Sequence, residues 1–226
     1  MYRILAYHRI TNQESSALCV SPRAFKRQVQ NMVRWGFTLV SLRELDALKA
    51  RGVKGRIAAI TFDDGFEDNY TQAFPVLTAY EASATFFVPS SLVGEPGRMN
   101  EAQLRDLTAS GFEIGSHSKT HRELPHLDDE ELYEEIAGSK KELEDIVGSS
   151  VESFAYPRGK YDFRCRTIVE SSGYLRAVVT PRGPGHYEGP YTMERVGIYR
   201  HTGSTAFALK LLGVYSQLKR YGWTRR

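Results

Sequence analysis

RIAAITFDDG, residues 56–65, decides how this 226-residue chain folds. An apolar run of this length, bounded by a turn signal, is typical of a strand that is buried on both faces. Strands of that kind belong to parallel sheets, whose faces are covered by helices. The run stops at Asp63-Asp64-Gly65. Two adjacent carboxylates are therefore predicted at the carboxyl end of a central strand.

Strand and helix patterns alternate along the rest of the chain. Strands are expected at residues 4–8, 37–41, 56–62, 83–88, 112–116, 153–157, 176–180 and 195–199. Helices are expected between them, at residues 21–36, 41–52, 69–80, 103–110 and 128–148, the first two with clear capping signals. Repeated strand–helix units predict an α/β fold, and this many strands favours a distorted (β/α) barrel of about seven to eight parallel strands over an open sheet.

The composition fits one globular domain spanning residues 1–226. Hydrophobic residues make up 41% and charged residues 25% of the chain, and the net charge is +3. No apolar run approaches the roughly 18 residues of a membrane-spanning helix, and the N-terminus lacks the apolar region of a signal peptide. A cytoplasmic location is expected, with export as the alternative if a leader was removed. Cys19 and Cys165 predict neither a disulfide framework nor a thiolate zinc site.

Basic residues are concentrated at the two ends of the chain. No nucleic-acid-binding motif accompanies them, so no nucleic-acid partner is expected. Residues 206–221 predict an amphipathic helix, and the basic residues at this end are Lys210, Lys219, Arg220, Arg225 and Arg226. The apolar side of the helix is expected to pack on the barrel and consists of Leu209, Leu212 and Leu218. The alternative is a peripheral contact with an anionic membrane surface.

Asp63 and Asp64 are the first candidates for chemistry. Neighbouring carboxylates repel each other and resist joint ionisation unless a cation compensates them. Alternation along a strand would point their side chains in different directions and so allow two separate roles. The alternative is a solvated Asp-Asp-Gly turn.

The second motif is GSHSKTH, residues 115–121. Histidines four residues apart share one face of a helix, with Cβ atoms roughly 5–6 Å apart. That spacing suits two imidazoles on one divalent metal ion, although such pairs also arise by chance. With an aspartate from another strand end, His117 and His121 would supply three ligands and leave positions open for water and substrate, as in a catalytic metal site.

FAYPRG, residues 154–159, again follows a strand. Its proline and last glycine bracket Arg158 and could direct the Arg158 backbone N–H toward the site as an oxyanion donor; the alternative is an ordinary loop. In a parallel barrel, functional groups gather where the carboxyl ends of the strands meet. The residues predicted at that rim are His8, Asp63, Asp64, His117 and Arg158.

These motifs resemble those of the polysaccharide deacetylase family, the metal-dependent carbohydrate esterases. TFDDG (61–65), HSKTH (117–121) and FAYPRG (154–159) are similar to the family's successive motifs. ILAYHRI (4–10) and residues 20–37 resemble the branch of exopolysaccharide poly-N-acetylglucosamine deacetylases. The resemblance covers nearly the whole chain, is least specific in the C-terminal third, and implies a distorted (β/α) barrel.

The resemblance implies an enzyme that removes acetyl groups from an N-acetylated glycan or glycan precursor. By motif position, Asp64, His117 and His121 would bind one divalent metal ion, Zn²⁺ first, with Co²⁺, Ni²⁺, Mn²⁺ or Fe²⁺ as alternatives. Asp63 would be the general base. Arg158, Tyr156 and Pro157 would bind the oxyanion or the substrate.

Two departures from the family pattern leave choices open. The arginine that usually orients the base is replaced by Ala155, so Arg158 or Arg195 could take its place. The usual late histidine has no clean match, and only His201 comes near. In the exopolysaccharide branch the first strand supplies the acid, and His8 matches that position. We expect His8 to be the acid, because Arg200 disfavours a charged imidazole at its neighbour.

Two other functions are compatible with these residues. The same metal site could hydrolyse a different amide, such as a lipid-linked sugar formamide or a small cyclic amide. A glycan-binding protein with a relic site is disfavoured, because every metal and base position is filled.

Overall fold

The computed structural model describes residues 1–13, 16–180 and 189–213. Nine strands within these residues form one sheet in the order β10-β9-β8-β7-β6-β5-β1-β11, with β4 paired to β5. All neighbouring strands in it are parallel. They are β1 (Tyr2–Tyr7), β4 (Phe37–Val40), β5 (Arg56–Phe62), β6 (Thr85–Val88), β7 (Glu113–Ser116), β8 (Ser153–Ala155), β9 (Arg176–Val179), β10 (Met193–Glu194) and β11 (Val196–Gly197); β2 (Arg9–Ile10) and β3 (Cys19–Val20) pair separately.

The central position of β5 explains why its sequence is apolar throughout. One edge of β5 pairs with β1 from Ile57 to Phe62. The other edge is shared, because β4 pairs with residues 56–59 and β6 with residues 61–62. Neighbours on both edges and packing on both faces bury every residue of β5 except Arg56.

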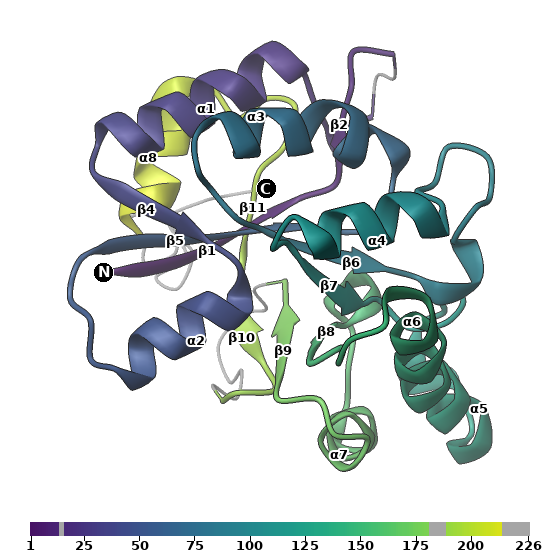
Figure 1. The fold of residues 1–226 in the computed structure, drawn as a ribbon. Helices are drawn as coiled ribbons and strands as arrows, with labels where there is room; N and C mark the ends of the chain where they lie inside the picture. The colour runs from purple at the N-terminus through teal and green to yellow at the C-terminus, as the bar shows by residue number, and fades with distance from the viewer. Residues whose placement is uncertain (14–15, 181–188, 214–226) are drawn as a thin grey trace.

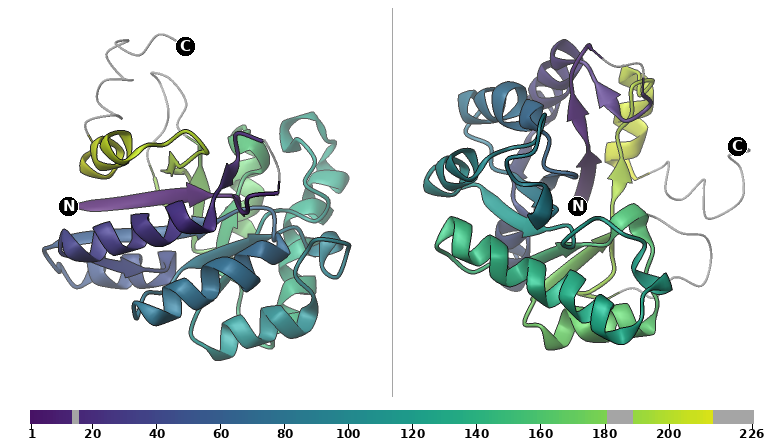
Figure 2. Two further views of the ribbon diagram at one scale, coloured as in Figure 1. Left: turned by 90° about the horizontal axis from the view of Figure 1, so that it is seen from above. Right: turned by 90° about the vertical axis from the view of Figure 1, so that its right-hand side faces the viewer.

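One short stretch joins the two edges of the sheet into a barrel. β10 pairs with β9, and β11 pairs with β1. The backbone N–H of Arg195, between β10 and β11, donates to Val179 at 3.0 Å, and that of Ile198, just after β11, donates to Ala6 at 2.8 Å. Counted as one stretch, β10 and β11 complete the eight strands that the sequence predicted, and the distorted (β/α) barrel is confirmed. Figure 2 shows the strands surrounded by helices.

Helices connect the strands and cover the outside of the sheet (Figure 1). They are α1 (Pro22–Arg34), α2 (Leu42–Ala50), α3 (Phe74–Ala79), α4 (Glu101–Ala109), α5 (Asp129–Tyr133), α6 (Ser139–Val147), α7 (Phe163–Ser171) and α8 (Ser204–Leu212). The predicted N-caps are confirmed: the Ser21 side chain accepts from Ala24, and Ser41 forms a capping box with Glu44. The predicted helix at 128–148 contains a π-helical turn, η4 (Glu134–Gly138), between α5 and α6. The sequence did not predict α7.

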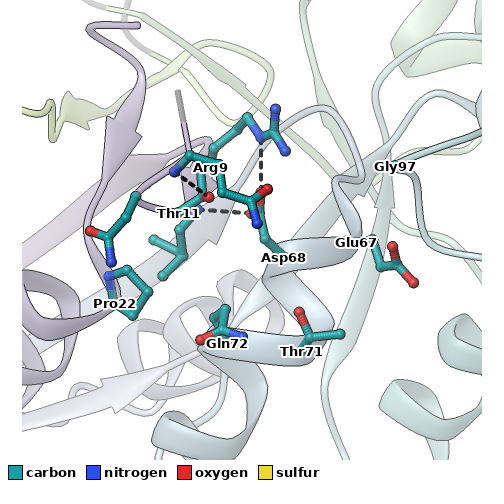
Figure 3. A pocket seen from close by; sticks show the side chains of 11 residues that line it. Arg9, Thr11, Pro22, Glu67, Asp68, Thr71, Gln72 and Gly97 are labelled. Atoms are coloured by element: carbon teal, nitrogen blue, oxygen red, sulfur yellow. Dashed lines mark hydrogen bonds and ion pairs between the residues drawn. The ribbon is translucent and has the colours of Figure 1, made fainter. Parts of the chain in front are cut away.

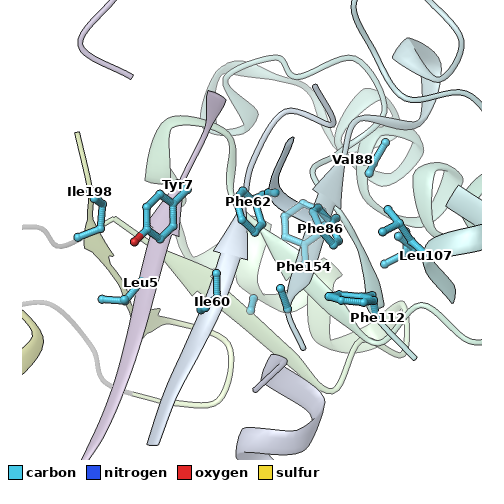
Figure 4. Packing of buried hydrophobic residues seen from close by; sticks show 14 of the residues in the cluster. Leu5, Tyr7, Ile60, Phe62, Phe86, Val88, Leu107, Phe112, Phe154 and Ile198 are labelled. Carbon is cyan, nitrogen blue, oxygen red and sulfur yellow. The ribbon is translucent and has the colours of Figure 1, made fainter. Parts of the chain in front are cut away.

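Side chains alternate between the two faces of the sheet, and this alternation positions the site. Leu5, Ile60 and Phe62 belong to the larger core, which packs against helices α1 and α4 (Figure 4). Ile57 and Ala59 point the other way, into a smaller core with Val178 from β9 and the buried leucines of α2. Residues 61 and 63 continue this second set, because strand side chains repeat with a period of two.

The C-terminal helix differs from the sequence prediction. α8 begins at Ser204, and the part of the predicted helix from residue 214 onward lies outside the described residues, as do Leu218, Lys219, Arg220, Arg225 and Arg226. Leu209 and Leu212 were expected to pack on the barrel but are exposed, and Phe207 and Leu211 are buried instead. Lys210 is buried and donates to the Gly197 carbonyl at 2.6 Å, so it is not part of a basic surface. No described helix is long and apolar enough to cross a membrane.

Candidate active site

Asp63 and Asp64 follow β5 but face different partners. Asp63 continues the inward alternation of the strand and is buried. Asp64 has a left-handed backbone, with φ 72°, so the chain turns there and its side chain reaches a different strand end. Gly65 also has positive φ and packs against Val88 so closely that a Cβ atom would lie 3.0 Å from the Val88 side chain. The sequence prediction of two separate environments agrees with this geometry.

Arg195 holds the Asp63 carboxylate with two hydrogen bonds. They measure 2.6 Å to Oδ1 and 2.7 Å to Oδ2, and the side chains are only 2% and 5% exposed. Burial alone would raise the pKa of Asp63, but Arg195 and the nearby histidines His117 and His8 outweigh it and hold the pKa below its ordinary value. Asp63 is therefore ionised at neutral pH.

Asp64, His117 and His121 form one cluster. Asp64 Oδ1 lies 3.6 Å from His117 Nε2 and 3.3 Å from His121 Nε2, and the potential ligand atoms of all three lie within 4.8 Å of one another. The sequence analysis expected the two histidines to share a helix face, and this prediction is wrong. They lie on a loop after β7, in which Ser118 and His121 have left-handed backbones. The loop curls back on itself, and the Ser118 hydroxyl accepts from the His121 N–H at 3.0 Å.

The chemistry of this cluster fits a divalent metal ion. The Nδ1 of His117 lies 2.7 Å from the Ala155 carbonyl, so Nδ1 carries the proton and Nε2 is free as a ligand. Burial lowers the pKa of His117 to about 4, which keeps the imidazole neutral. Burial alone would raise the pKa of Asp64, but the hydrogen bond from His121 and the nearby histidines hold it below its ordinary value. One carboxylate and two imidazoles match the donors that Zn²⁺ prefers.

The FAYPRG loop reaches the same rim, but the Arg158 side chain turns away. Arg158 has a left-handed backbone, with φ 55°, and its guanidinium donates to Glu123 at 3.0 Å while 65% exposed. Of the two arginines proposed to orient Asp63, the structure places Arg195 there and not Arg158. Tyr156 and Pro157, in the same loop, are buried.

The two candidate acids occupy different places. His8 follows β1, and its Nε2 lies 3.8 Å from Asp63 Oδ2. Its carbonyl accepts from the Asn69 side chain at 2.7 Å. His201 is exposed on a turn beyond β11 and, within the described residues, makes no hydrogen bond or ion pair with the Asp63 or Asp64 side chains. Of the two histidines, the structure thus places His8 next to Asp63.

Sequence analysis missed Arg98, which contacts the backbone of Asp64. Its guanidinium donates to the Asp64 carbonyl and lies 4.0 Å above the ring of Phe66, with Arg9 on the same ring at 4.6 Å. No local pattern marks this residue, because it lies on a long loop between β6 and α4.

A polar hollow of about 460 Å³ begins one residue beyond His8 (Figure 3). Arg9 donates to Asp68 at 2.8 Å across its wall. The side chains of Thr71 and Gln72 line its floor and are exposed. The hollow therefore offers hydroxyl and amide groups beside the candidate site.

The fold and the site define a class of protein. A parallel (β/α) barrel with an arginine-paired carboxylate and an Asp-His-His cluster at its carboxyl rim is the arrangement of hydrolytic metalloenzymes. The model of the polysaccharide deacetylase family matches residues 50–177, more than half of the chain. The chain belongs to the polysaccharide deacetylase family, which places it among the hydrolytic N-deacetylases.

Individual relatives agree with this assignment. YxkH of Bacillus subtilis (strain 168), provisionally named a polysaccharide deacetylase, is 30% identical over 207 residues, covering 90% of this chain and 74% of YxkH. The poly-beta-1,6-N-acetyl-D-glucosamine N-deacetylase of Staphylococcus aureus (strain MSSA476) is 24% identical over 80% of this chain and 70% of its own length. The deacetylase PplD of Streptococcus pyogenes, solved in complex with acetate, has the same fold, with a TM-score of 0.84 at 24% identity over 93% of this chain and 97% of PplD.

Proposed function

We propose that the protein hydrolyses the acetamide groups of an N-acetylated glycan or glycan precursor. One observation carries the proposal: the buried Asp63–Arg195 pair lies beside a cluster of three residues suited to one divalent ion, Zn²⁺ first. A base and a metal site at one barrel rim are the two parts that metal-assisted amide hydrolysis needs. The staphylococcal relative acts, by its name, on an N-acetylglucosamine polymer, which supports a similar substrate here.

Asp63 and His8 would divide the proton transfers. Asp63 accepts a proton from the attacking water, and Arg195 keeps both carboxylate oxygens in place. A divalent ion, held by Asp64, His117 and His121, would supply Lewis-acid chemistry. The water oxygen bonds to the carbonyl carbon, His8 donates a proton to the nitrogen, and the C–N bond breaks. Acetate and a glucosamine amine leave.

The FAYPRG loop would stabilise the negative oxygen. The Arg158 backbone N–H donates no hydrogen bond within the described part of the chain, so it is available to the substrate. A preorganised N–H donor of this kind stabilises charge that develops in the transition state. Tyr156 and Pro157, the other two residues expected to bind the oxyanion or the substrate, are buried, so we assign them to holding the loop backbone and not to direct contact with the substrate.

The polar hollow beyond His8 suits a polymer rather than a small amide. Exposed hydroxyl and amide groups at Thr71 and Gln72 can hydrogen-bond sugar hydroxyls. A glycan bound with one unit at the site would extend a neighbouring unit over this hollow. A small cyclic amide would leave it unused.

Acetate release tests the proposal. Protein stripped of metal with a chelator should release no acetate from N-acetylglucosamine oligomers, and Zn²⁺ should restore the reaction. Asp63→Asn should bind Zn²⁺ normally and release no acetate, because it retains the shape of the side chain without the basic oxygen. If no N-acetylated oligomer releases acetate, while a sugar formamide releases formate or a cyclic amide is opened, the protein acts on a different amide and the proposal is refuted.

Location and membrane contact stay predictions. A cytoplasmic site of action on a glycan precursor is expected from the sequence. Contact of the C-terminal segment with an anionic membrane would have to use residues beyond 213, because Lys210 is buried. Co-sedimentation with anionic liposomes, comparing the full chain with one ending near Gly213, tests this contact.

A further inference from the structure

One buried carboxylate holds the loop between the two histidines from outside. Glu135 is only 4% exposed. Its Oε2 accepts the backbone N–H groups of Lys119 at 3.0 Å and Thr120 at 2.9 Å. Its Oε1 accepts the Thr120 hydroxyl. Both carboxylate oxygens are thus engaged by the two central residues of the loop.

The π-helical turn η4 aims this carboxylate at the loop. Glu135 lies in η4, and Ser139 follows four residues later on the same side. The Ser139 hydroxyl bonds to that of Ser116 at 2.7 Å, directly before the first histidine. Neighbouring Glu134 instead meets the Lys119 ammonium near the surface. π-helical turns inside α-helices frequently occur at functional sites.

The backbone of this loop needs such external support. Ser118 and His121 both have positive φ, 65° and 62°. Non-glycine residues keep this conformation only where their surroundings over-determine it. Without the bonds to Glu135, Lys119 and Thr120 could relax, and the imidazole of His121 would move with them.

We propose that Glu135 is a positioning residue, which fixes the Lys119–Thr120 segment and thereby the separation of the His117 and His121 imidazoles. The inference rests on the proposed function in one respect, that these two histidines bind a metal ion. Glu135 is not itself a ligand, because its oxygens are occupied by the loop. Partners of this indirect kind typically change metal affinity by about 10–100-fold when removed.

Three substitutions of Glu135 separate contact from charge. Glu135→Ala removes every bond to the loop. Glu135→Gln keeps one oxygen for the two N–H groups and can donate from its amide to the Thr120 hydroxyl oxygen. Glu135→Asp keeps the charge but shortens the side chain. Glu134→Ala is the matched control, because Glu134 is adjacent and contacts only the Lys119 side chain among these loop residues.

The measurement is the Zn²⁺ affinity of metal-free protein, by competition with a chromogenic chelator and without glycan. We expect Glu135→Ala and Glu135→Asp to bind Zn²⁺ about 10–100-fold more weakly, while Glu135→Gln and Glu134→Ala remain close to wild type. The visible spectrum of bound Co²⁺ should change in the first two variants only. Thermal unfolding of the metal-free proteins identifies variants that are folded.

The outcomes distinguish this inference from the proposed function. Wild-type Zn²⁺ affinity in Glu135→Ala, or an equal loss in Glu134→Ala, would overturn the inference. If Glu135→Ala does not fold, Glu135→Gln and Glu135→Asp provide the test. Zn²⁺ affinity that is retained in Glu135→Asp but lost in Glu135→Gln would mean that the charge of residue 135 matters and its contacts do not. That result would also overturn the inference. A wild-type protein that binds no Zn²⁺ would instead refute the metal site of the proposed function.

Discussion

Replacing Arg195 with leucine should destabilise the protein strongly. Arg195 and Asp63 are almost fully buried, and two hydrogen bonds of 2.6 and 2.7 Å join them. Removing one partner leaves the other charge buried without compensation, which costs about 3–5 kcal/mol. At roughly 2–4 °C per kcal/mol for a chain of this size, the melting temperature should fall by about 6–20 °C.

The stability that Arg195→Leu loses relative to the wild type should depend on pH. In the wild type, the pKa of Asp63 is depressed, so its contribution is complete above the ordinary carboxyl pKa of 3.8 and is lost as the pH falls through the lower folded value. Without Arg195, burial dominates and raises the pKa of Asp63. The variant then favours the neutral acid and loses stability as the pH rises through that raised value. The difference in melting temperature between the wild type and Arg195→Leu should therefore be large at neutral pH and small in mildly acidic buffer.

Thermal unfolding of the metal-free proteins, followed by circular dichroism across a pH series, measures both effects. Arg158→Leu is the matched control, because Arg158 is 65% exposed and its pair with Glu123 is a surface ion pair, worth about 0–1 kcal/mol. The reasoning is refuted if Arg195→Leu melts within roughly a degree of the wild type at neutral pH. It is also refuted if this difference in melting temperature does not become smaller on acidification.

Four further predictions concern the site. Asp64→Asn should lose Zn²⁺ in a metal analysis and release no acetate, because one of three ligands is replaced by a weaker donor; full metal content would contradict the ligand assignment. His8→Ala should lower turnover by about 10²–10⁴-fold with metal content intact, whereas His201→Ala should stay near wild type, and the reverse pattern would exchange their roles. Gln72→Ala should raise KM for a long glycan and leave KM for a single acetylated sugar unchanged; an equal rise for both would remove the hollow from substrate binding. The metal-free protein should lose stability as the pH falls from about 6.5 to about 4, because His117 binds a proton in the unfolded chain over this range but stays neutral while buried in the folded protein. In His117→Gln, the melting temperature should lack this part of its dependence on pH.

The fold could be predicted because its signals are local. The apolar run of β5, the caps at Ser21 and Ser41 and the strand patterns are each set by a few neighbouring residues. Helix α7 was missed because the two residues that it buries, Cys165 and Val169, are weaker helix formers than the leucines that α2 and α4 bury, although the Asp162 side chain caps its N-terminus. The inward burial of Lys210 could not be read from a charged residue on an amphipathic pattern, since its bond to Gly197 depends on how α8 docks.

The site was predictable in its members and less so in its geometry. Asp64, His117 and His121 come together as the spacing indicated, but on a loop whose left-handed residues no periodicity reveals. The choice between Arg158 and Arg195 was open because Arg195 lies 132 residues from Asp63. A contact at that separation is determined only when the barrel closes.

The position of Arg195 makes the order of synthesis matter for this protein. Asp64, His117 and His121 all precede β9 in the chain, so a ribosome would release every potential metal ligand before it releases the arginine. A nascent chain ending before Met193 could gather those ligands but would leave the carboxylate of residue 63 without its counter-charge. The stretch from β10 to β11, which joins the two edges of the sheet, also contains Arg195 and so supplies that positive charge. The barrel would then close and the protein would become able to hydrolyse its substrate in the same step. An incomplete chain that lacks this stretch would have no hydrolytic activity.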